Sequence, residues 1–158
     1  MLKNRQFIGF IGAVAVLGGL WSSQAIAQSR PSTEFFQGRG VAQGAAFSQG
    51  RNANVSLTLD GDNFGLEMTE PQAANRSRAP GRVQYRGAIV RRTPNSGGPN
   101  NFTLTTRVRS FDSSEIFRVL PNTTGTCRIE VFDARVIYSN CTTVADDGST
   151  RFLGLEQF

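Results

Sequence analysis

The segment CRIEVFDARVIYSNC, residues 127–141, decides how this chain folds. If it turns about Ala134, residues whose numbers add up to 268 lie opposite one another. Side chains alternate between the two faces of a strand, so this register predicts one face with the opposed pairs Cys127–Cys141, Ile129–Ser139 and Val131–Ile137. The other face then carries Arg128, Glu130, Phe132, Val136, Tyr138 and Asn140. A single register therefore sorts the two faces and brings the two sulfurs together.

Cys127 and Cys141 are the only cysteines of the chain. No C-x-x-C motif is present, and no histidine or lysine lies nearby to lower a thiol pKa. A structural disulfide is therefore favoured over a redox-active dithiol. In an oxidising compartment such a bridge contributes about 2–4 kcal/mol to the free energy of unfolding.

The residues before and after this hairpin also alternate with period two, and no segment has a helical period. Residues 53–59 and 64–68 form one alternating pair about the turn Gly61-Asp62-Asn63, and 82–92 and 102–109 form another. Turn residues recur about every 8–12 positions, which is typical of antiparallel sandwiches and barrels. The sequence thus predicts an all-β fold of about seven to nine short strands, as a small antiparallel β-barrel or alternatively a β-sandwich.

Residues 38–50 carry an unusual stripe of small side chains at every second position: Gly38, Gly40, Ala42, Gly44, Ala46, Ser48 and Gly50. A strand with one such face can bend sharply, or let another backbone or a ligand approach closely. We expect a strongly coiled barrel strand here, and a ligand-binding face is the alternative. The stripe favours a barrel over a sandwich.

Residues 1–27 resemble a secretory signal peptide. Basic Lys3 and Arg5 precede an apolar run over 7–21, and the segment ends with Ala25-Ile26-Ala27. We therefore expect a cleaved signal at 1–27, a flexible lead-in at 28–34 and a single all-β domain at 35–158. The protein would be exported, periplasmic or secreted, with no transmembrane segment after cleavage.

The composition restricts the possible chemistry. The chain has no histidine, and Lys3 is its only lysine, so His-based nucleophile pairs, His metal ligation and Schiff-base lysines are excluded from the mature chain. We expect no catalytic role, no metal and no cofactor. A hydrolase that uses Asp and Glu is a less favoured alternative, because no spacing singles out a carboxylate pair.

Arginine is the only cation left after residue 27, with 15 Arg against 12 acidic residues and a net charge of +3. Arg82, Arg86 and Arg92 share one face of a predicted strand, and Arg107 and Arg109 lie on the polar face of its expected partner. Guanidinium groups bind carboxylate and phosphate bidentately. These five arginines are candidates for an anion-binding face, although a merely solvated strand face has the same pattern. Arg76 and Arg78 in the preceding loop could add to it.

The partners that suit this face are an anionic polysaccharide, lipid headgroups or an acidic protein. Nucleic acid is disfavoured, because the net charge is small and no aromatic residues are interleaved with the arginines. We expect an exported, non-catalytic binding or structural module of the cell envelope. The alternative is a carrier of an apolar small molecule, since the predicted barrel resembles, in general plan only, the small secreted ligand-binding barrels.

Overall fold

The structure, a computed structural model, describes residues 32–72, 79–114 and 118–155. Its elements are β1 (Glu34–Gly44), β2 (Phe47–Asp60), β3 (Asn63–Thr69), β4 (Arg82–Pro94), β5 (Phe102–Ser113), β6 (Arg118–Leu120), β7 (Gly125–Phe132), β8 (Arg135–Thr143), a 3-10 turn η1 (Asp146–Gly148) and β9 (Thr150–Gly154). The all-β prediction is confirmed. The predicted signal peptide at 1–27 lies outside the described residues, and β1 begins at Glu34, the last residue of the expected lead-in.

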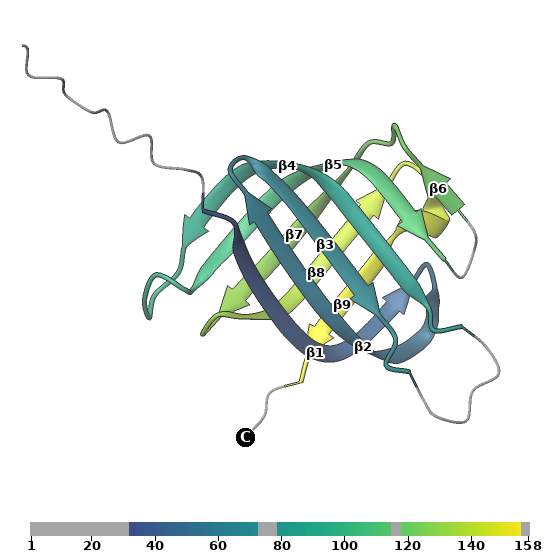
Figure 1. Ribbon diagram of the computed structural model, residues 1–158, viewed down its shortest axis with the longest axis horizontal. Coiled ribbons are helices and arrows are strands. Elements are labelled where there is room, and N and C mark those ends of the chain that lie inside the picture. The colour runs from purple at the N-terminus through teal and green to yellow at the C-terminus, as the bar shows by residue number, and fades with distance from the viewer. Residues whose placement is uncertain (1–31, 73–78, 115–117, 156–158) are drawn as a thin grey trace, which may run out of the picture.

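Eight of these strands form a closed antiparallel barrel (Figure 1). The order around the ring is β4-β3-β2-β1-β9-β8-β7-β5, and pairing of β5 with β4 closes it. Strands that follow each other in the chain are therefore neighbours, and β9 joins the end of the described chain to β1. The short β6 pairs with the last residues of β5 and lies outside the ring, at one end of the barrel. Of the two architectures considered, the barrel is thus the one formed.

The core fills the inside of the barrel with one face of each strand. On β2, for example, Ala53, Val55, Leu57 and Leu59 are all buried. The largest fully buried side chains are Tyr85, Phe47, Phe102, Phe111, Phe152, Leu57, Leu66, Met68 and Leu104. Burial of each large apolar side chain contributes about 1.5–3 kcal/mol. The period-two pattern of the sequence therefore places one face of each strand in the packed interior of the barrel.

The β7–β8 hairpin contains the predicted disulfide, with Cys127 directly opposite Cys141 and both residues buried in the core. The predicted register holds from Cys127 to Glu130 and then fails. Val131 pairs with Val136, which is buried, whereas Ile137 is 39% exposed. The prediction that Val131 faces Ile137, with Val136 on the outer face, is wrong.

The turn geometry explains this correction. Asp133 and Ala134 both have positive φ, 48° and 59°, which is the backbone of a two-residue hairpin turn that matches the twist of the strands. The centre of the turn lies between these two residues rather than on Ala134. Ile137 is then an extra residue in β8, and the resulting bulge restores the expected register beyond it.

The small-residue stripe does not form a single strand over 38–50. The chain reverses after Gly44, which pairs with Phe47 across a two-residue turn, because Gly44 (φ 92°) and Ala45 (φ 42°) both adopt left-handed conformations. On β1 itself the stripe permits close approach of a neighbouring backbone, since a Cβ on Gly38 or Gly40 would collide with the carbonyl of Val136 or Leu153. The small residues therefore let β1 pack closely against β8 and β9, where the first strand of the barrel meets the last two.

Candidate functional site

The predicted arginine face is carried by β4 and β5, which pair with each other along nearly their whole length. Residues opposite each other in such a pair point to the same side of the sheet. Two irregularities interrupt the ladder, each with one extra residue: Val90 on β4 and Arg109 on β5. An extra residue reverses the alternation beyond it, so these two bulges decide which arginines share a side.

Arg86, Arg107 and Arg109 lie together on the outside of the barrel, as predicted. Arg86 pairs with Ser110, the residue after Arg109, and Arg107 pairs with Ala88. All three arginines are exposed. Arg86 and Arg107 are diagonal neighbours, a relation that places Cβ atoms about 7–8 Å apart or slightly less.

Arg91 joins this group, although sequence reasoning missed it. Its neighbour Val90 is the extra residue, so Arg91 pairs with Thr105 and points outward. Thr105 is two residues from Arg107, which makes Arg91 the second diagonal neighbour of Arg107. A strict period of two assigns residue 91 to the inner face, and the sequence pattern did not indicate the bulge that reverses it.

Arg92 is consequently on the other side of the sheet from the face predicted for it. It pairs with buried Leu104, and its guanidinium carbon lies 3.8 Å from the centroid of the Phe102 ring. Its two terminal nitrogens bind the carboxylate of Glu34 on β1 at 2.7 and 3.0 Å. The grouping of Arg92 with the other four arginines is therefore wrong, because the bulge at Val90 separates them.

The ion pair between Glu34 and Arg92 also shifts the pKa of the Glu34 carboxyl. The hydrogen bonds from Arg92 lower the pKa of Glu34 below its ordinary value; desolvation opposes them in part, and the positive charge of Arg92 adds a smaller lowering. Arg92 thus links β4 to β1 and covers an aromatic ring of the core. These contacts give it a structural role and leave it no free charge for a partner.

Arg82 points outward as predicted, but it is neutralised by neighbours. Its Nε donates to Glu67 at 3.2 Å, one terminal nitrogen lies 3.6 Å from the carboxylate of Asp112, and the other donates to Gln84 at 3.2 Å. Two carboxylates on one guanidinium leave no excess positive charge at this corner of the sheet. Of the five predicted residues, three remain as candidates for binding an external anion.

We use the term arginine face for Arg86, Arg91, Arg107 and Arg109. Within the described residues, none of these four guanidinium groups has a carboxylate partner, a hydrogen-bond partner or an aromatic ring against it. Arg107 lies at the centre, with Arg86 and Arg91 on its two diagonals. Arg76 and Arg78 lie outside the described residues. The arrangement can bind an extended partner that carries several anionic groups.

The other titratable groups of interest lie in the core. Burial raises the pKa of the Tyr85 hydroxyl above its usual range, so this group stays protonated. It donates to the carbonyl oxygen of Gly148 at 2.7 Å and lies 2.8 Å from Thr150 Oγ1. The Tyr85 hydroxyl therefore ties β4 to the η1–β9 segment across the barrel.

Within 32–72, 79–114 and 118–155, no three His, Cys, Asp or Glu residues come together as a metal site requires. None of the helical structure in those ranges is long and apolar enough to cross a membrane. No family model matches this chain, and neither does any curated protein or solved structure. The site must therefore be interpreted from its own geometry.

Proposed function

We propose that this protein is an exported, non-catalytic binding module of the cell envelope that holds an anionic polymer on its arginine face. One observation carries the proposal: four exposed arginines lie on one outer surface and their guanidinium groups pair with no carboxylate among the described residues, while Arg82 and Arg92 nearby are both paired. Charged side chains on a merely solvated strand face are expected to alternate in sign or to pair. Here the paired arginines, Arg82, Arg92 and Arg128 (with Glu130), lie at the margins of the arginine face.

The geometry favours a partner with repeated charges over a single small anion. The arginines follow one another at diagonal positions of a convex barrel wall, about 7–8 Å apart. A linear acidic polysaccharide laid across β4 and β5 presents carboxylate or sulfate groups at comparable intervals, and each guanidinium can bind one of them bidentately. An anionic lipid surface or an acidic protein shares this chemistry and is the alternative partner.

The signal-like sequence at 1–27 and the disulfide support the exported location. Disulfides persist in oxidising compartments, and Cys127 and Cys141 form one here. An envelope or extracellular location also brings the protein to acidic polysaccharides. The carrier hypothesis and the carboxylate-based hydrolase stay untested predictions.

Retention on an acidic polysaccharide matrix tests the proposal. Arg107→Gln with Arg109→Gln should elute at distinctly lower salt than the wild type, with an affinity about tenfold lower, because two exposed ion pairs of ~0.2–1 kcal/mol each are lost. The matched control is Arg39→Gln with Arg135→Gln, which removes the same charge from β1 and β8, on the opposite side of the ring. Equal retention of the two double variants would show that net charge alone governs binding and would contradict the proposal.

A further inference from the structure

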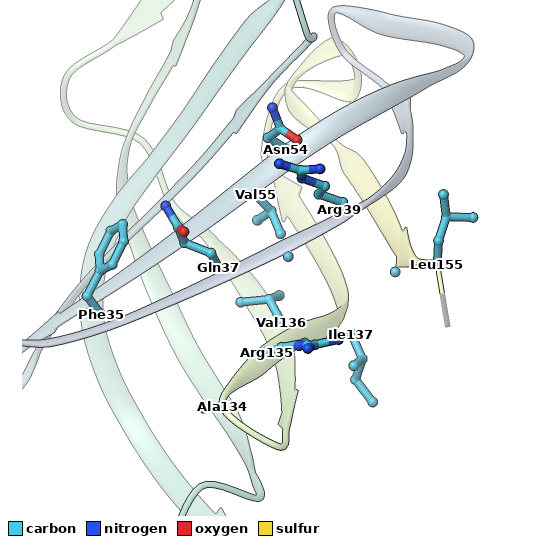
Figure 2. Close-up of a pocket in the computed structure, with 12 residues that line it drawn as sticks. Phe35, Gln37, Arg39, Asn54, Val55, Ala134, Arg135, Val136, Ile137 and Leu155 are labelled. Carbon is cyan, nitrogen blue, oxygen red and sulfur yellow. The ribbon is translucent and has the colours of Figure 1, made fainter. Parts of the chain in front are cut away.

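A groove opens in the barrel wall where β9 ends (Figure 2). β9 separates β1 from β8 only as far as Gly154, and Leu155 then donates its backbone N–H to the Arg39 carbonyl at 2.8 Å. Beyond that point β1 and β8 approach each other directly and pair at Gln37 and Arg135. The space between them measures about 950 Å³, within the range of small-molecule sites.

Part of the groove's lining is apolar. Phe35, Ile137 and Leu155 line it while 57%, 39% and 63% exposed, respectively. Val55 and Val136, which belong to the core, reach it from below, between the Arg39 and Arg135 side chains in the view of Figure 2. Single exposed apolar residues are ordinary, but three that line one hollow leave apolar surface for a ligand to cover.

The charged side chains that line the groove, among the described residues, are of one sign. Arg39 of β1 and Arg135 of β8 line it, both are exposed, and neither has an acidic partner among the residues described. Within the part of the chain that the structure describes, no carboxylate lines the groove, and Gln37 and Asn54 are the uncharged polar side chains. The groove thus combines two free guanidinium groups with an apolar surface.

We propose that this groove binds a single-chain anionic amphiphile, with its carboxylate or phosphate head between Arg39 and Arg135 and its alkyl chain along Phe35, Ile137 and Leu155. Charge complementarity selects the head, since the guanidinium groups that line the groove can bind a carboxylate or phosphate through charge-assisted hydrogen bonds. The exposed apolar side chains select the tail. This site is independent of the arginine face, because β1 and β9 lie opposite the β4–β5 pair in the ring.

Two other occupants fit less well. A peptide strand needs a continuous free strand edge, and the direct pairing of Gln37 with Arg135 interrupts that edge. A second copy of the chain, related by a two-fold axis, would bring two such pairs of arginines together with no carboxylate among the described lining residues of either groove. A short, flexible chain meets neither obstacle.

Calorimetric titration of the full chain with octanoate, decanoate and dodecanoate, each below its micelle concentration, tests the proposal. We expect one site per molecule and an affinity that rises about tenfold for each two added methylene groups, because each buried methylene contributes ~0.8 kcal/mol. The Arg39→Gln, Arg135→Gln variant should bind about tenfold more weakly. Arg107→Gln with Arg109→Gln is the control and should bind like the wild type.

Ile137→Ser should weaken binding of dodecanoate more than of octanoate, whereas Leu153→Ser, also exposed but outside the groove, should change neither. Thermal unfolding of each variant shows that it is folded. An affinity independent of chain length, equal binding of decanol, or equal loss in the Arg107/Arg109 control would overturn the proposal. The proposal would also be overturned if the protein formed a concentration-dependent dimer instead of binding the ligand, or if it bound the ligand only after residues 156–158 were removed.

Discussion

At the residue scale, the Glu34–Arg92 pair makes stability depend on pH. The folded pKa of Glu34 is lowered, so the pair contributes stability above the ordinary value of 4.5 and loses it as the pH falls through the folded pKa. Because both side chains are partly exposed, Glu34→Gln should lower the free energy of unfolding by only ~0.2–1 kcal/mol at pH 7. Urea unfolding at pH 7 and pH 3 measures this, and the difference between variant and wild type should be smaller at pH 3. An equal difference at both pH values would show that the ion pair is not its cause.

The sequence placed Arg86, Arg107 and Arg109 on the outer face, where the structure has them, but it missed Arg91 and put Arg92 on the wrong side of the sheet. Anion binding by these residues stays a prediction. The assignment of faces assumed unbroken alternation along 82–92, whereas Val90 is an extra residue that reverses it. A bulge of this kind depends on pairing with β5, which the β4 sequence does not contain. Arg82 was placed on the correct face, but its neutralisation by Glu67 and Asp112 depends on contacts with β3 and β5.

At the element scale, the β7–β8 hairpin should resist reduction in the native state. Cys127 and Cys141 are 1% and 0% exposed, so a reductant reaches the bond only when the hairpin opens. Reduction in denaturant, followed by refolding, should lower the free energy of unfolding by about 3 kcal/mol, the value expected for a loop of this length. Urea unfolding of the two forms measures the loss, and Cys127→Val with Cys141→Val controls for thiol chemistry. Two reactive thiols in the untreated native protein would contradict the disulfide.

The β7–β8 hairpin also shows how much of a strand pairing can be predicted from the sequence. The opposed cysteines and the Ile129–Ser139 pair were predicted correctly, because buried positions recur with period two and both sulfurs must meet. The pairing of Val131 was not, because the turn uses two residues with positive φ, Asp133 and Ala134, neither of which is glycine. Asp-Ala gives little signal for such a turn, so its centre was misplaced by half a residue.

At the scale of the whole molecule, alternation and regular turns predicted an all-β sandwich or barrel and the small-residue stripe favoured the barrel that is formed, but the sequence did not show how the strands meet at its seam. Closure depends on where β9 ends and on how closely β1 approaches β8, which the glycines of β1 permit. The groove at this seam was therefore beyond sequence reasoning, since its residues come from four strands, the first two and the last two of the barrel. Most of the arginine face could be predicted from the sequence because its residues lie on two successive strands, β4 and β5.

The central claim is that an anionic polymer lies on the arginine face, and arginine side-chain NMR tests it most directly. Titration of a sulfated oligosaccharide into the folded protein should shift the Nε–Hε signals of Arg86, Arg91, Arg107 and Arg109. The signals of Arg82 and Arg92 should stay in place, because carboxylates already hold them. Shifts confined to Arg39 and Arg135, or spread evenly over all arginines, would contradict the claim.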